Sequence, residues 1–176
     1  MTSRSWGRAW LVRGANVRGV NRVGSWLAGG YCSIGWDEAG PIEPGGPRDE
    51  IRAALAAAYP GRSSRWVASS AGNLDRFLNG IATGDLVVTV DGPKIYLGTV
   101  RSAPSWATAA VPGEARRRAV AWANPEEPVA RDELSAEAAS KLRTMLTVTS
   151  LTPALAEFGR LAYESYGPRR RTVTRL

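Results

Sequence analysis

Short apolar runs and amphipathic stretches follow one another along the chain, without the regular strand–helix alternation of a parallel α/β fold. Runs rich in β-branched and aromatic residues predict strands over residues 9–13, 31–36, 119–123 and 147–151. Apolar residues at helical spacing predict helices over residues 21–28, 48–58, 63–81, 132–146 and 153–163. The pattern therefore predicts an α+β domain with a small curved mixed β-sheet or barrel flanked by helices.

The clearest element is a β-hairpin over residues 86–101. Alternating β-branched residues flank Asp91 and Gly92, and an Asp-Gly pair favours the tight turn that joins two antiparallel strands. In the helical stretch before it, Gly72 and Asn73 interrupt the apolar pattern or mark where a new helix begins. The segment 102–118 is rich in alanine and proline, ends in three consecutive arginines and is predicted to be a long loop.

The chain is predicted to fold as one domain, because 176 residues are most economically a single globular unit. We place this domain at residues 1–167 and interpret residues 168–176, which hold four arginines, as a basic tail or linker. No apolar run approaches the roughly 20 residues that span a bilayer, and the first residues lack the apolar stretch of a secretory signal. These features favour a cytoplasmic protein without a membrane partner.

Missing residue types exclude several kinds of chemistry. The chain has no histidine, so it lacks the usual general base, the usual partner of a nucleophilic Ser or Cys, and the usual transition-metal ligand. Cys32 is the single cysteine, which excludes an intrachain disulfide and a cysteine-rich zinc site. Neither a P-loop nor a G-x-G-x-x-G phosphate motif occurs. We therefore expect a binding domain with no catalytic residue, no metal site and no cofactor.

The charge balance points to a polyanionic partner, and we expect nucleic acid. The formal net charge is +7, and residues 1–36 contain five arginines but no acidic residue. Guanidinium groups bind phosphate through a fork of N–H donors. A GC-rich genome would also raise the arginine content, so a merely solvated surface stays open as an alternative. The arginines that we expect to contact phosphates are Arg13, Arg18, Arg22, Arg76 and Arg101.

Two of the seven tryptophans are candidates for a ligand pocket. Trp36 and Trp106 each close an apolar segment where a Gly- or Pro-bearing loop begins, so their rings are placed to line a cleft. A flipped-out base can stack on such rings, and each stack is worth about 1–3 kcal/mol. The alternative, that both rings lie in the core, stays open from the sequence.

Five segments occur in a characteristic order: AWLVR, YCSIGWDE, GNLDRFLNGI, GDLVVTVDGPKIYLGTV and AVAW. In this order the chain resembles the PUA-like superfamily, in particular its EVE and YTH-like reader domains. The resemblance runs from about residue 9 to about residue 151 and is strongest in the hairpin. It implies a curved sheet with flanking helices around an aromatic pocket for one modified base. The residues that it implies at this pocket are Trp36, Trp106, Asn73 and Ser33, with Tyr31 or Tyr96 as alternatives for the second aromatic wall.

The resemblance implies binding of modified double-stranded DNA, with a methylated or otherwise modified base flipped into the pocket. Similar readers serve modification-dependent (type IV) restriction systems, so a fused or associated nuclease domain is the implied partner. One alternative is a PUA-like module that binds tRNA or another structured RNA. The other is a nucleotide-acting hydrolase or sensor similar to the ASCH group, in which Lys94 with Asp85 or Asp91 would serve.

Overall fold

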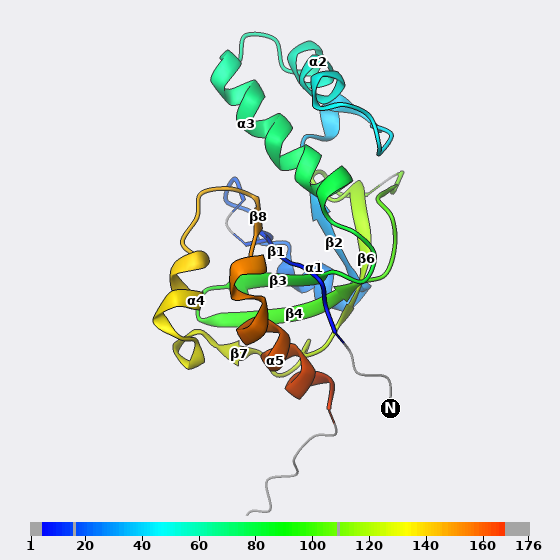
Figure 1. Ribbon diagram of the computed structural model, residues 1–176. Helices are drawn as coiled ribbons and strands as arrows, with labels where there is room; N and C mark the ends of the chain where they lie inside the picture. Colours follow the sequence, from blue (N-terminus) through cyan, green and yellow to red (C-terminus); the bar gives the residue numbers. More distant parts are fainter. Residues whose placement is uncertain (1–4, 16, 109, 168–176) are drawn as a thin grey trace, which may run out of the picture.

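A single curled, mixed sheet organises the described part of the chain and forms a half-barrel (Figure 1). The computed structural model describes residues 5–15, 17–108 and 110–167. The strands are β1 (Ala9–Val12), β2 (Tyr31–Ile34), β3 (Leu86–Asp91), β4 (Lys94–Val100), β5 (Ser105–Trp106), β6 (Arg116–Trp122), β7 (Val129–Ala130) and β8 (Val148–Ser150). They pair in the order β2–β6–β4–β3–β1–β8, with β5 beside β6 and β7 beside β4. β1 and β3 run parallel, whereas the other pairs in the described residues are antiparallel.

Helices flank this sheet at both ends of the molecule. The α-helices are α1 (Val23–Gly29), α2 (Arg48–Ala58), α3 (Ser64–Asp75), α4 (Ala136–Lys141) and α5 (Leu155–Tyr166). The short turns are η1 (Asp37–Ala39), the π-helical η2 (Arg76–Gly80), η3 (Arg131–Glu133) and η4 (Thr152–Ala154). In Figure 1, α2 and α3 stand at the top, α4 lies at the left of the sheet and α5 lies below it.

Strand β1 separates two hydrophobic cores, because successive side chains of a strand point to opposite faces. Trp10 and Val12 belong to the core that α1, α2 and α3 share with β2. Ala9 and Leu11 belong to the second core, which α4 and α5 cover. A strand that is buried on both faces is apolar at every position, and this accounts for its sequence AWLV.

The hairpin and the helix at 48–58 are confirmed. The hairpin pairs Leu86 with Thr99 at one end and Asp91 with Lys94 at the other. Gly92 in the turn has a φ of 58°, a left-handed conformation that glycine adopts without a steric penalty. The coarse α+β class, with a curled mixed sheet and flanking helices, is confirmed as well.

Three predicted element boundaries are wrong. The predicted loop 102–118 contains β5 and the start of β6, so Arg116, Arg117 and Arg118 are strand residues. Gly72 does not interrupt the helix: α3 runs through it into η2, because burial outweighs the cost of about 1 kcal/mol for one helical glycine. The helix predicted over 132–146 is reduced to η3 and α4, and Met145 beyond it is 92% exposed.

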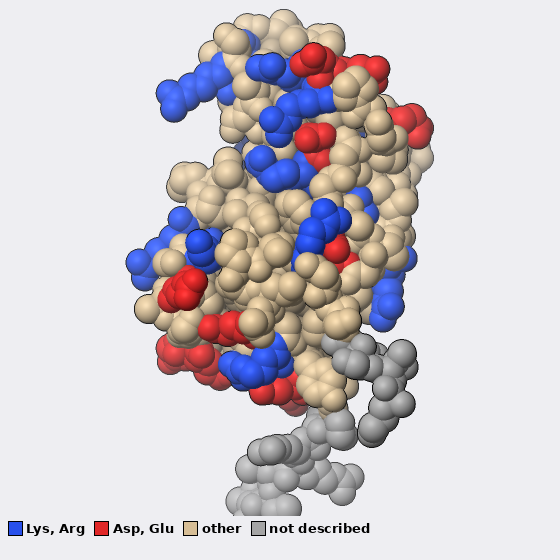
Figure 2. All heavy atoms as spheres, in the orientation of Figure 1, with Lys and Arg blue, Asp and Glu red and all other residues tan. Residues whose placement is uncertain are grey.

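Charged side chains are distributed unevenly over the surface. Figure 2 shows acidic side chains concentrated at the lower left, near the segment that holds Asp132, Glu133 and Glu137. Several basic side chains lie on the α2–α3 region above it. Among the described residues, no helix combines the length and the apolar character that a bilayer crossing requires. The predicted basic tail, 168–176, lies outside the described residues.

Candidate functional site

Two buried arginines begin β6 and share one face of that strand. In the antiparallel pairing with β2, Arg116 lies opposite Ile34 and Arg118 lies opposite Cys32. Ile34 and Cys32 belong to the core under α2 and α3, and directly opposite residues of an antiparallel pair share a face. The strand therefore carries both guanidinium groups inward, and Arg116 and Arg118 are only 1% and 3% exposed.

The guanidinium of Arg118 is used within the fold. It donates hydrogen bonds of 2.7–3.2 Å to the carbonyl oxygens of Phe77, Leu78, Ile81 and Ser102. Three of these carbonyls belong to η2 or to the residue directly after it, where a helix end leaves acceptors without partners. Arg118 is therefore a structural clamp between β6 and the end of η2.

Arg116 has fewer partners than Arg118. Its Nη2 donates to the carbonyl oxygen of Gly40 at 2.8 Å and to that of Trp36 at 3.5 Å. Its guanidinium lies 5.1 Å from the centre of the Trp106 ring, within cation–π range. Its Nε is buried without a hydrogen-bond partner among the described residues. Burial lowers the pKa of Arg116 from its ordinary value, and the negative charge of Asp37 opposes this effect.

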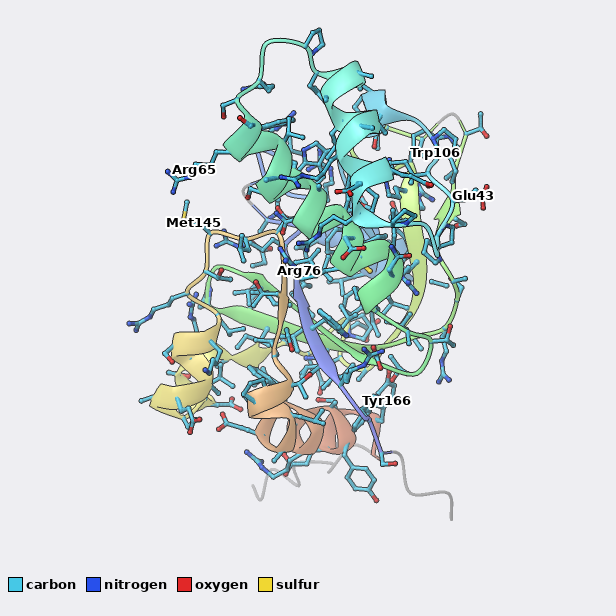
Figure 3. The ribbon with its side chains drawn as sticks, turned by 45° about the horizontal axis from the view of Figure 1, so that its top comes forward. Glu43, Arg65, Arg76, Trp106, Met145 and Tyr166 are labelled. Carbon is cyan, nitrogen blue, oxygen red and sulfur yellow. The ribbon has the colours of Figure 1, made fainter. Side chains whose placement is uncertain are left out.

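A pocket of about 190 Å³ opens beside Arg116. Its walls come from the loop between η1 and α2, from η2, and from β5 with the residue before it. The lining residues are Pro41, Ile42, Glu43, Pro44, Leu78, Pro104, Ser105, Trp106 and Arg116. Figure 3 shows Trp106 and Glu43 on the same side of the molecule. Because small-molecule sites usually measure about 300–1,000 Å³, this pocket suits a single small planar group.

The turn after β2 carries two more unpaired buried atoms. Trp36 has a φ of 60°, a conformation that costs a non-glycine residue about 1–3 kcal/mol, and its indole Nε1 has no described partner. Asp37 accepts a 2.6 Å hydrogen bond from the amide of Gly113 through Oδ2, whereas its Oδ1 is unpaired. Of the five unpaired buried side-chain atoms in the described residues, three thus belong to Trp36, Asp37 and Arg116. Backbone strain and unpaired polar groups in one place are typical of functional sites.

Tyr59 adds an aromatic ring and a hydroxyl to this cluster. Burial raises the pKa of Tyr59 to about 12, and its hydrogen bond with Glu38 is the second cause. The positive charge of Arg18 opposes the shift, so this exposed arginine lies near the hydroxyl. Tyr59 also packs edge-on against Trp66, with the ring centres 5.2 Å apart.

The cluster lies inside a region that a known family shares. A family model with the description "Domain of unknown function (DUF8426)" matches residues 18–151. The chain belongs to the DUF8426 family. The matched region includes every residue that lines the pocket and both buried arginines, but it does not include α5. Searches of curated proteins and of solved structures find no match for this chain.

In this DUF8426 domain, both predicted tryptophans contact Arg116, but in different ways. Trp106 lines the pocket and lies over the guanidinium. Trp36 offers its backbone carbonyl, while its ring packs against the core under α2 and α3. Each tryptophan is partly buried, so neither residue is completely enclosed in the core.

The other predicted aromatic and hydroxyl residues are engaged away from the pocket. Ser33 is buried on β2 and accepts a 2.9 Å hydrogen bond from the indole of Trp26. The Tyr31 hydroxyl donates to the Glu114 carboxylate at 2.8 Å. Tyr96 is 6% exposed on β4. None of Ser33, Tyr31 and Tyr96 is among the described residues that line the pocket.

The position predicted for Asn73 is wrong. The residue lies inside α3 rather than before a helix, and its amide is committed to the fold. Its Nδ2 donates to the carbonyl oxygen of Ser69 at 3.1 Å, and its Oδ1 accepts from the amide of Val148 at 2.9 Å and from Arg76 at 3.2 Å. Asn73 therefore fastens α3 to β8, and these hydrogen bonds explain why its amide is not available to the pocket.

The remaining predicted phosphate ligands differ in availability. Arg18 and Arg101 are exposed, and Arg13 is half-buried at the end of β1. Arg22 is half-buried and donates to the carbonyl oxygen of Pro112 at 3.2 Å. Arg18 lies close enough to Tyr59 for its positive charge to oppose the raised pKa of that residue.

Of the two carboxylates of the hydrolase alternative, Asp85 lies at the far end of the hairpin from Lys94, whereas Asp91 lies directly opposite Lys94. Asp85 is buried before β3 and accepts 2.9 Å hydrogen bonds from the Trp10 indole and from the amide of Ala82. Lys94 lies opposite Asp91 at the other end of the hairpin, where it is exposed. In the described residues, no group of three or more His, Cys, Asp or Glu side chains could hold a metal ion.

Sequence reasoning missed Arg116, the pocket wall at Glu43 and Tyr59. One available signal for Arg116 is the strand pattern of RRRAVAW. Extending its alternation backwards from Val120 places Arg118 and Arg116 on the same inward face. The loop residues around Glu43 offer no such periodicity.

Proposed function

We propose that this DUF8426 domain is a PUA-like reader of a modified base in double-stranded DNA. The observation that carries the proposal is the buried Arg116, which lines a small pocket together with Trp106 and whose Nε has no hydrogen-bond partner among the described residues. An unsatisfied buried donor costs about 1–3 kcal/mol, and a ligand acceptor would recover this cost. The half-barrel with flanking helices is consistent with the PUA-like part of the proposal.

The chemistry of the pocket suits a nucleobase better than a sugar or an aliphatic ligand. The Trp106 ring offers a stacking surface, which every base can use because every base has a π-face. Arg116 offers only donors, and each base presents acceptor atoms on its edge. The proline and isoleucine side chains at residues 41, 42, 44 and 104 provide apolar walls suited to a methyl group. The small volume favours one base rather than a whole nucleotide.

A base inside a duplex must leave the stack to reach such a pocket, and unstacking costs a few kcal/mol. Contacts to phosphates can supply the affinity that offsets this cost, while the pocket supplies selectivity. Arg18 and Arg101 are exposed and suited to such contacts. In this proposal the chemical step belongs to a separate nuclease, either fused to the reader or associated with it.

A titration of duplexes that differ in one base tests the proposal. The panel holds cytosine, 5-methylcytosine, 5-hydroxymethylcytosine or N6-methyladenine at one central position, with an RNA duplex of the same length as a separate arm. We expect one modified duplex to bind at least about tenfold more tightly than the unmodified one, and Trp106→Ala to remove this preference.

The control variant is Trp6→Ala, which removes a partly buried tryptophan that stacks on Tyr166 instead of Arg116. It is expected to keep the preference for the modified duplex. Equal binding of all DNA duplexes by the wild type would refute the proposal, and tighter binding of the unmodified RNA would favour the RNA-binding alternative.

A further inference from the structure

Two arginine side chains converge over Gly72 on α3. The position that a Cβ atom would occupy on Gly72 lies 3.4 Å from Nη2 of Arg48 and 3.4 Å from Nη1 of Arg76. Arg48 begins α2 and Arg76 follows α3, so two helices present positive charge to one point. Like charges repel, and the charge of Arg48 adds to burial in lowering the pKa of Arg76. An anion between the two guanidinium groups would remove this repulsion.

The rest of each guanidinium is already held in place. Arg76 donates to the carbonyl oxygen of Val148 through Nε at 2.8 Å and to Oδ1 of Asn73 through Nη2 at 3.2 Å. Arg48 forms an ion pair with Oδ2 of Asp75 through Nε at 3.6 Å. Among the described residues, no hydrogen bond or ion pair engages Nη1 of Arg76 or Nη2 of Arg48. The two nitrogens nearest to the Gly72 position are therefore free donors.

Arg48 and Arg76 are each only a few residues away in the sequence from a residue that lines the pocket. Arg48 follows the pocket-lining Pro44 by four residues, which span at most about 14 Å even in extended chain. Arg76 precedes the pocket-lining Leu78 by two residues in η2. Both arginines are thus joined to the pocket by short stretches of chain. Figure 3 shows Arg76 beside α3, with α2 between it and Trp106.

We infer that Arg48 and Arg76 clamp a backbone phosphodiester of the DNA strand whose base enters the pocket. The inference rests on the proposed function and adds the subsite that holds the strand. Gly72 places no side chain between the two guanidinium groups, and each group would donate one charge-assisted hydrogen bond to a phosphate oxygen. The contact is independent of sequence, so it strengthens binding to modified and unmodified DNA alike.

The first test is Arg48→Gln, because Arg48 is half-exposed and its loss leaves the contacts of Arg76 with Val148 intact. The matched control is Arg160→Gln on α5, which removes the same charge from the opposite end of the molecule. Both variants and the wild type are titrated with the 5-methylcytosine and unmodified duplexes at several salt concentrations. We expect Arg48→Gln to weaken both duplexes about tenfold and to reduce the salt slope by about 0.9.

Gly72→Ala is the second test and does not alter net charge. Its methyl group would occupy the point between the two guanidinium groups, while alanine favours the helix more than glycine does. We expect weaker DNA binding together with unchanged or higher thermal stability. If Arg48→Gln matches Arg160→Gln, and Gly72→Ala binds like the wild type, the clamp is overturned.

The two proposals fail in different ways. If only the clamp proposal is wrong, the wild type still prefers the modified duplex. Failure of the proposed function would abolish that preference while Arg48→Gln still lowered affinity and the salt slope. Absence of any binding to DNA would overturn both.

Discussion

Arg116 and Arg118 lie two residues apart on one face of β6, and both are almost completely buried, yet their surroundings differ. Arg118 donates to four backbone carbonyls around the end of η2. Arg116 lines the pocket, donates to the Gly40 and Trp36 carbonyls, lies over the Trp106 ring and has an unpaired Nε. Burial alone therefore does not distinguish the two arginines, because their hydrogen-bond partners differ while their exposure does not. The decisive difference is the number of donors that the fold itself satisfies.

The largest expected effect is the loss of stability in Arg118→Met. The substitution removes a buried charge together with its hydrogen bonds and leaves several buried carbonyls without donors, so we expect a loss of about 3–5 kcal/mol in the free energy of unfolding. Urea denaturation measures this loss. A change below about 1 kcal/mol would contradict the clamp role of Arg118.

Arg116→Met is expected to cost less stability and more selectivity. It removes one short hydrogen bond, to Gly40, and also removes the unpaired Nε, so a loss of about 1–2 kcal/mol is expected. Preference for a modified duplex should disappear, since the donor in the pocket is gone. Urea denaturation and the duplex titration measure both quantities. If the two methionine variants lost equal stability, and Arg116→Met kept the preference, Arg116 would be a second clamp.

The smallest expected effect is on the pH dependence of stability and comes from Tyr59, whose negative charge raises the pKa of Arg116 against the lowering effect of burial. The pKa of Tyr59 is raised from 10.0 to about 12 in the fold, so the folded state favours the neutral phenol. This contribution to stability is fully present below pH 10.0 and is lost as the pH rises toward about 12. Tyr59→Phe should therefore show a flatter decline of the unfolding midpoint in this range. Identical pH profiles for the variant and the wild type would contradict the assignment.

Most of the fold follows from local patterns, whereas the site depends on long-range pairing. The hairpin and α2 could be predicted because alternation, an Asp-Gly turn and helical spacing all act within a few residues. The inward position of Arg116 was harder to predict. The Gly40 carbonyl that binds it is far away in the sequence, and the Trp106 ring that it contacts lies across a loop. A run of three arginines after a Pro-Gly segment is typical of an exposed loop.

Asn73 shows how a local pattern can predict a role that the fold does not support. Its predicted role depended on a helix break at Gly72, but the helix continues, and the amide is used by Val148 on β8. That partner is distant in the sequence, and no local pattern indicates it. Trp106, which stands where an apolar segment meets a loop, does line the pocket, whereas Trp36, predicted on the same ground, is not among the described residues that line it.

The central claim is that the guanidinium of Arg116 donates to a ligand, and NMR spectroscopy of the arginine Nε–H groups tests it most directly. Arg116→Met and Arg118→Met assign the two signals in spectra of the ¹⁵N-labelled domain. On titration with the tightest-binding modified duplex, we expect the Arg116 signal to shift strongly while the Arg118 signal stays in place. An Arg116 signal that does not move while the duplex binds would contradict the account.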